Sequence, residues 1–100
     1  MTGEMTESDV TREEFGIHFA LADKYGGTVK PFDVYQGPYV LIRGQRIFLV
    51  TDDGAVGRWF NESTRKESAD FFQYRDERKT IREALLAAKD VIPRRRRAVK

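Results

Sequence analysis

Few side chains in this 100-residue sequence belong to types that do chemistry near neutral pH. His18 is the single histidine, and its imidazole could act as a general base or bind a metal. A metal site would need more ligands, and without cysteine or a second histidine all of them would be carboxylates. His18 also lies at the centre of an apolar helical stripe, where buried polar groups are usually hydrogen-bonded. We therefore expect His18 to be a structural residue bonded to a carbonyl.

Three aspartates, Asp33, Asp52 and Asp53, could serve hydrolysis as paired carboxylates or bind magnesium. However, aspartate before Gly54 is also favoured in turns, because it tolerates the turn backbone. The sequence contains no glycine-rich phosphate loop, no serine nucleophile elbow and no His-Glu-x-x-His motif. It therefore predicts a protein that is not an enzyme and that uses no cofactor or metal.

The strongest electrostatic feature is a run of arginines near the C-terminus. The whole chain has a net charge of +2, and residues 93–100 carry five basic residues and no acidic one, so residues 1–92 have a net charge of −3. Such a run could neutralise phosphates in a salt-dependent way, although it could also be a solubilising tail or fold back onto the acidic residues 1–23. Nucleic-acid binding is therefore the alternative function, through Arg65, Lys66, Arg94, Arg95, Arg96 and Arg97.

The sequence from 39 to 60 predicts the elements that would position these residues. Three β-branched and aromatic runs are separated by Gly44-Gln45 and Asp53-Gly54, which favour two-residue hairpin loops. The result is a three-stranded antiparallel meander in which Phe48 lies opposite Leu41 and Trp59. Residues 28–35 predict a fourth strand, at an edge because Pro31 has no N–H. One face of the meander would carry Tyr39, Leu41, Phe48, Val50 and Trp59.

Helices are predicted on both sides of these strands in the sequence. A capping box at Thr11 and Glu14 predicts a helix over 12–25, ended by Gly26-Gly27. A second box at Thr64 and Glu67 predicts helix over 64–92, either continuous or broken near Lys79. The fold class is therefore α+β, with an antiparallel sheet of three or four strands between an N-terminal and a C-terminal helix.

The chain divides into a flexible N-terminus at 1–10, one α+β domain at 11–92 and a flexible basic tail at 93–100. The absence of cysteine permits a cytoplasmic location, and neither a signal peptide nor an apolar stretch of about 20 residues is present. We therefore expect a cytoplasmic protein with no membrane partner. It could be a monomer or a homodimer, and Phe72 and Leu86 lie off the main apolar stripe as candidates for a dimer contact.

Aromatic residues on and around the predicted sheet favour protein binding, because tyrosine, tryptophan and arginine often dominate binding energy. Trp59 and Tyr39 would be exposed if both helices covered the other face, but burial is favoured because an open aromatic patch promotes aggregation. The leading function is a small protein-binding module, such as an inhibitor or modulator of a larger nucleic-acid-handling assembly. Phage and plasmid accessory proteins provide an analogy of size and architecture. The expected contact residues are Tyr39, Arg43, Arg46, Trp59, Arg75, Arg78 and Lys79.

The order helix–strands–helix over residues 12–74 is similar to the double-stranded-RNA-binding domain. In that family the second helix begins with lysines that contact phosphates, and Thr64-Arg65-Lys66 followed by Ala69 is the only local match. Asn61-Glu62-Ser63 replaces the glycine-bearing turn that precedes the helix in that family. We therefore assign no family from the sequence.

Overall fold

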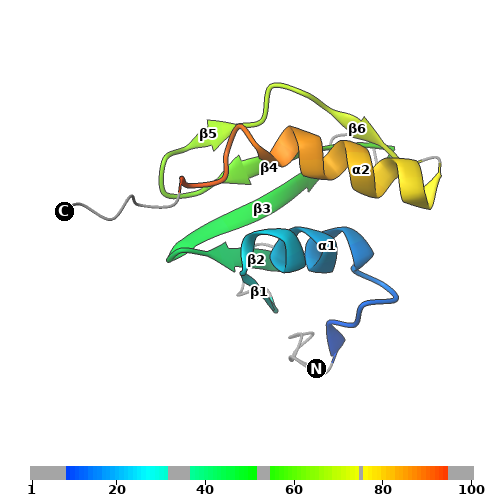
Figure 1. The fold of residues 1–100 in the computed structure, drawn as a ribbon, viewed down its shortest axis with the longest axis horizontal. Coiled ribbons are helices and arrows are strands. Elements are labelled where there is room, and N and C mark those ends of the chain that lie inside the picture. The colour runs from blue at the N-terminus through cyan, green and yellow to red at the C-terminus, as the bar shows by residue number, and fades with distance from the viewer. Residues whose placement is uncertain (1–8, 32–36, 52–54, 75, 95–100) are drawn as a thin grey trace.

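The computed structural model describes residues 9–31, 37–51, 55–74 and 76–94, and it confirms the α+β fold class. The described strands form one antiparallel sheet in the order β1-β2-β3-β4-β5, with β6 also paired to β4 (Figure 1). The sheet therefore contains the expected meander and edge strand, together with two short strands beyond them. The elements are α1 (Gly16–Tyr25), β1 (Thr28–Lys30), β2 (Tyr39–Ile42), β3 (Gln45–Thr51), β4 (Val56–Asn61), β5 (Lys66–Glu67), β6 (Phe72–Gln73) and α2 (Glu77–Ala88).

The turn between β2 and β3 is Arg43-Gly44, one residue earlier than predicted. Both residues have positive φ, 49° for Arg43 and 81° for Gly44, as a type I′ hairpin turn requires. Phe48 consequently pairs with Tyr39 instead of Leu41. This pairing differs from the predicted one by two residues, so each side chain of this hairpin keeps its predicted face.

The pairing between β3 and β4 differs from the prediction by one residue, which has a larger consequence. Trp59 pairs with Leu49, and Phe60 takes the predicted place of Trp59 opposite Phe48. Because successive side chains point to opposite faces, this shift puts Trp59 on the other face of the sheet. The prediction that Trp59 shares a face with Tyr39 and Phe48 is therefore wrong. The predicted turn at 53–54 lies outside the described residues.

Both helices lie on the same face of the sheet (Figure 1). Helix α1 contacts β1 and β2, α2 contacts β4 and β6, and the two helices contact each other. Trp59 is completely buried beneath them, which confirms the expectation of burial although its face was predicted wrongly. The core under the helices consists mainly of Leu21, Ala22, Val40, Ile42, Ile47, Trp59, Phe72, Ala84, Ala87, Ala88 and Val91.

The first helix is shorter than predicted at its start. Thr11 Oγ1 accepts a hydrogen bond from Glu14 N at 3.3 Å, but this contact belongs to a turn, and α1 begins at Gly16. The helix ends as predicted, with Gly26 in the left-handed conformation at φ 73°. No described helix is long and apolar enough to cross a membrane.

The prediction of helix from residue 64 is wrong, because the Asn61 side chain organises a turn there. Asn61 Oδ1 accepts from Ser63 N at 2.8 Å and from Thr64 N at 3.1 Å. Arg65 then adopts a left-handed φ of 59°, and the chain reverses so that Glu67 of β5 pairs with Phe60. The local match to the double-stranded-RNA-binding domain therefore lies in a turn and a strand.

The second helix begins only at Glu77. The Asp76 side chain caps it by accepting from Lys79 N at 3.0 Å. The preceding strand β6 places Phe72 in the core with 1% of its surface exposed, so Phe72 does not form the predicted outer contact. Leu86 remains on the outside, with 57% exposed.

Asn61 also ties the end of β4 to the segment after α2. Its amide Nδ2 donates to Gln45 Oε1 at 2.7 Å and to the Val91 carbonyl at 2.8 Å. The side chain is buried, with 1% exposed, and both of its polar atoms are hydrogen-bonded, as burial requires. This contact fixes the C-terminal end of the described chain beside the first residues of β3.

Candidate functional site

The sheet face opposite the helices, which we call the helix-free face, carries a row of three aromatic side chains. Phe48 of β3 pairs directly with Tyr39 of β2 and with Phe60 of β4. Directly paired residues share a face and adjacent strands are about 4.8 Å apart, so the row crosses three strands. The rings of Tyr39 and Phe48 have centroids 5.2 Å apart. Phe48 is buried in the middle of the row, whereas Tyr39 and Phe60 are partly exposed.

Arginine side chains lie over rings of this face. The Arg46 guanidinium is 5.7 Å from the centre of the Tyr39 ring, and that of Arg65 is 5.8 Å from the centre of the Phe60 ring. Cation–π contacts of this kind contribute about 0.5–1 kcal/mol at exposed sites. Arg58 lies 5.8 Å from the centre of the Phe71 ring. The face therefore presents rings and guanidinium groups in fixed relative positions.

Two glutamates pair with these arginines. Arg46 Nε lies 2.6 Å from Glu62 Oε1, and Arg58 Nε lies 2.8 Å from Glu67 Oε1. The Arg46 and Glu62 side chains are 40% and 38% exposed, so their ion pair contributes little to stability. Its main effect is to orient the Arg46 side chain.

The helix-free face is basic, although residues 1–92 as a whole have a net negative charge. Lys30 pairs with Tyr39 and therefore lies on this face. Among the residues of this face that the structure describes, four are basic and two are acidic, which gives a net charge of +2. Charge sums along the sequence missed this basic face, because they add residues from both sides of the sheet. Its charged residues are Lys30, Arg46, Arg58, Arg65, Glu62 and Glu67.

The predicted contact residues separate into different parts of the structure. Tyr39 and Arg46 come together on the helix-free face. Trp59 lies under the helices and has no exposed surface. Arg78 and Lys79 are exposed in the first turn of α2, on the other side of the sheet. The remaining predicted contact in this region, Arg75, lies outside the described residues.

Arg43 links the β2–β3 turn to the segment after α2. Its guanidinium donates a hydrogen bond to the Pro93 carbonyl, so Arg94 follows directly from this contact. Arg65 lies in the turn after β4, and this turn is tied to the start of β3 because Glu62 N donates to the Arg46 carbonyl at 3.0 Å. We call Arg43, Arg46, Arg65 and Arg94 the basic end of the sheet.

The other residues predicted to contact nucleic acid have different positions. Lys66 is exposed at the start of β5, next to Arg65 of the basic end. Arg95, Arg96 and Arg97 lie outside the described residues. The structure therefore brings Arg65 and Arg94 toward one end of the sheet, and the sequence continues from Arg94 with three further arginines.

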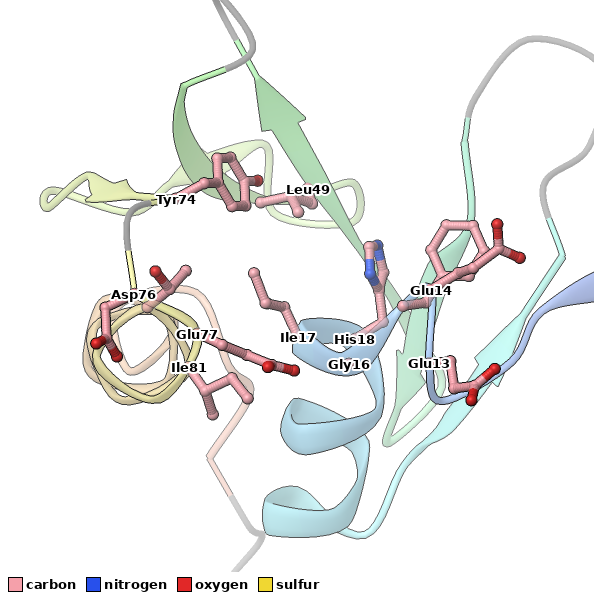
Figure 2. A pocket seen from close by; sticks show the side chains of 12 residues that line it. Glu13, Glu14, Gly16, Ile17, His18, Leu49, Tyr74, Asp76, Glu77 and Ile81 are labelled. Carbon is pink, nitrogen blue, oxygen red and sulfur yellow. The ribbon is translucent and has the colours of Figure 1, made fainter.

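A cavity of about 440 Å³ lies on the helix-bearing side, between the first turns of α1 and α2 (Figure 2). This volume is within the range of small-molecule sites. The described lining contains four carboxylates and neither lysine nor arginine. It consists of Glu13, Glu14, Phe15, Gly16, Ile17, His18, Leu49, Tyr74, Asp76, Glu77, Thr80 and Ile81.

His18 lines this cavity and, as expected, is buried and hydrogen-bonded to the backbone, at Pro38. Only 7% of it is exposed, and its ring makes edge contacts with Phe15 at 5.6 Å and Trp59 at 5.8 Å between centroids. Burial lowers the pKa of His18 from its ordinary 6.5 to about 4, and a hydrogen bond to the Pro38 backbone raises it by a smaller amount. The imidazole is therefore neutral at pH 7.

Two further polar groups of the cavity are the hydroxyls of Thr80 and Tyr74. The Thr80 hydroxyl donates to the Gln73 carbonyl at 2.6 Å. Partial burial raises the pKa of the Tyr74 phenol, so this group remains protonated at neutral pH. Among the residues that the structure describes, no three His, Asp or Glu side chains are placed to share a metal ion.

Comparisons with known protein families, curated proteins and solved structures find no match for this chain.

Proposed function

We propose that the protein is a non-enzymatic protein-binding module and that its contact surface is the helix-free face. The observation that carries this proposal is the aromatic row on a sheet face that no described helix covers, with arginines over Tyr39 and Phe60. Aromatic residues and arginine are enriched in protein interfaces, whereas lysine is depleted. Three of the four basic residues on this face are arginines.

The partner that fits this face is a protein surface with an apolar centre and an acidic rim. The net charge of +2 on the described residues of this face complements acidic groups and would steer such a partner. Because the rings and glutamates already orient the arginines, less side-chain freedom is lost on binding. A small binder can modulate a larger assembly, including one that handles nucleic acid, by covering a surface that the assembly needs. In keeping with the cysteine-free sequence, the proposal places this partner in the cytoplasm.

The test compares two double variants in affinity purification from the native host, with nuclease treatment of the lysate. Tyr39→Ala with Arg46→Ala removes a ring and its arginine from the helix-free face. Arg78→Ala with Lys79→Ala removes two charges from the other side and serves as the control. We expect the wild type and the control to recover one defined protein after nuclease treatment. The face variant should bind that protein at least tenfold more weakly, a loss of about 1.4 kcal/mol or more.

Three results would contradict the proposal. The face variant could keep full affinity, or the control variant could lose the partner instead, which would move the interface to α2. Nuclease treatment could also remove every partner, which would favour nucleic acid. The melting temperature of the control variant should remain close to that of the wild type, because exposed substitutions usually change stability by about 0.5 kcal/mol or less. The face variant should melt somewhat lower, because the Tyr39 ring packs against Phe48, and circular dichroism checks that it still folds.

The basic end of the sheet favours a second candidate function, the binding of nucleic acid through phosphates. The contact between Arg43 and Pro93 makes the arginine run start beside the β2–β3 turn. Charges on the folded domain and in the C-terminal segment could therefore contact one phosphate backbone. Binding of this type is independent of sequence and depends strongly on salt.

Deletion of Arg94 to Lys100 tests this second function. The deletion removes five basic residues and changes the net charge from +2 to −3. If the protein binds a fluorescent single-stranded DNA of about 20 nucleotides, the truncated chain should lose most of its affinity and have a smaller salt slope. Tight, salt-sensitive binding by the truncated chain would instead place the phosphate contacts on the folded domain alone. Fluorescence anisotropy at several salt concentrations measures both quantities.

A further inference from the structure

We infer that the cavity between the first turns of α1 and α2 is a binding site for an organic cation with an aromatic or apolar body. This site lies on the helix-bearing side of the sheet (Figure 2). It is separate from the helix-free face, because Leu49 in its lining pairs with the buried Trp59 under the helices. The inference is therefore independent of the protein-binding function proposed above.

Apolar and aromatic side chains form the walls that would hold the body of the ligand. Ile17 and Leu49 approach the cavity from α1 and β3, and Ile81 approaches it from α2 (Figure 2). Phe15 and Tyr74 add two aromatic rings. Rings of this kind attract cations through the negative charge of their faces, by about 0.5–1 kcal/mol at exposed sites and more when the site is dry.

The Tyr74 wall depends on a glycine in β4. A Cβ built on Gly57 would lie 2.7 Å from the Tyr74 hydroxyl and 3.2 Å from the Phe72 ring. The absence of a side chain at residue 57 therefore lets Tyr74 lie against the sheet. The Phe72 ring supports it from one side, with the two centroids 5.7 Å apart.

The charge of the lining determines which ligands can enter. The Glu77 side chain extends from α2 toward the first turn of α1, whereas the carboxylates of Glu13 and Glu14 point away from the space between the two helices (Figure 2). Asp76 also lines the cavity while it caps α2. No described lining residue is a lysine or an arginine, and His18 is uncharged at neutral pH. The four carboxylates therefore attract cations and repel anions.

Two helix N-termini oppose this effect, because the helix dipole places a positive partial charge there. That charge is about half an elementary charge for each helix, so α1 and α2 together supply about one positive charge. The described lining carries four carboxylates, so the charges of the described lining and the two helix ends together are negative. A cation is therefore preferred over an anion, in spite of the helix ends.

Three probes of similar shape and different charge test this inference on the full chain. They are phenethylamine, which is a cation at pH 7, the neutral 2-phenylethanol and the anionic 3-phenylpropionate. Titrations followed by two-dimensional NMR report both the affinity and the position of binding. We expect phenethylamine to bind about tenfold more tightly than 2-phenylethanol, and 3-phenylpropionate to bind more weakly than either. The shifted resonances should come from residues 13–18 and 74–81.

Two variants connect the preference to specific side chains. Glu77→Gln should reduce the ratio of the cation and alcohol affinities several-fold, whereas Asp70→Asn, outside the lining, should leave that ratio unchanged. Ile81→Trp should fill the cavity and weaken both ligands. Circular dichroism of each variant checks that α2 still forms.

The inference would be overturned by equal affinities for the cation and the alcohol, or by preference for the anion. Absence of binding at millimolar probe concentrations would also overturn it, as would shifts confined to the helix-free face. An affinity ratio that Glu77→Gln does not change would exclude charge selection at this cavity. None of these results would bear on the protein-binding face, since Tyr39 and Arg46 are not part of the lining.

Discussion

Replacement of Trp59 by alanine is expected to lower the free energy of unfolding by about 3–5 kcal/mol, a large share of the stability of a small domain. The indole has no exposed surface and lies between β4 and α2. Its Nε1 donates to the Ala84 carbonyl at 2.9 Å, and its ring contacts His18 and Phe72. Alanine would therefore leave a cavity and remove a buried hydrogen bond.

Chemical denaturation of matched variants measures this loss. Trp59→Phe keeps an aromatic ring but lacks the indole donor, so we expect an intermediate loss of stability. Phe71→Ala is the control for aromatic truncation at a side chain that is 57% exposed, and it should cost about 1 kcal/mol or less. Wild-type tryptophan emission should be blue-shifted and poorly quenched by acrylamide. Equal losses in Trp59→Ala and Phe71→Ala would contradict the position of Trp59 in the core.

Trp59 also illustrates which parts of the fold the sequence could predict. The three β-rich runs and the glycines at 26 and 44 were sufficient to predict a helix followed by an antiparallel meander. The pairing of β3 with β4 was not predictable from Asp53-Gly54, because Thr51 pairs with Gly57 and not with Val56, so one more residue separates the paired positions than a two-residue loop allows. The longer connection permits a shift of one residue, which reverses the face of every side chain in β4.

The segment after β4 shows a different limit of prediction. Thr64 and Glu67 have the spacing of a helix start, but Asn61 binds the backbone of Ser63 and Thr64 first. Side-chain bonds of this kind give the backbone an alternative to helix. The Asn61 bonds to Gln45 and Val91 then hold the turn in place. Since Gln45 and Val91 are distant in sequence from Asn61, the spacing of Thr64 and Glu67 could not show that a turn would form there instead of a helix.

The candidate surfaces were only partly predictable, because they too depend on contacts between residues that are distant in sequence. Tyr39 and Arg46 were expected to be contact residues, and the structure brings them together. Phe60 and Arg65 join them only because of the observed β3–β4 register. The cavity between the helices depends on the start of α2 at Glu77, whereas the sequence predicted helix from residue 64. The correct β3–β4 register was therefore necessary to find the helix-free face, and the correct start of α2 was necessary to find the cavity.

Acidification is expected to destabilise the protein through His18. The folded pKa is about 4, whereas the unfolded chain has the ordinary value of 6.5. Between these values the unfolded state binds a proton that the folded state does not, so stability falls as the pH decreases. Above pH 6.5 both states are neutral and His18 adds no pH dependence. The difference in pKa corresponds to a loss of about 3 kcal/mol, which is complete below pH 4.

The variant His18→Gln isolates this effect from other groups that titrate over the same range. Glutamine keeps a donor for the Pro38 backbone but has no titratable group, so the variant should be less stable at pH 7 and less sensitive to pH. Asp23, whose pKa Arg12 lowers through a hydrogen bond, titrates at lower pH and is present in both proteins. Urea denaturation between pH 7.5 and 4 should give unfolding free energies that converge as the pH falls. Parallel curves for the two proteins would show that His18 is protonated in the folded state or that its surroundings open to water. Converging curves would establish that the buried imidazole beside Trp59 makes the fold sensitive to mild acid.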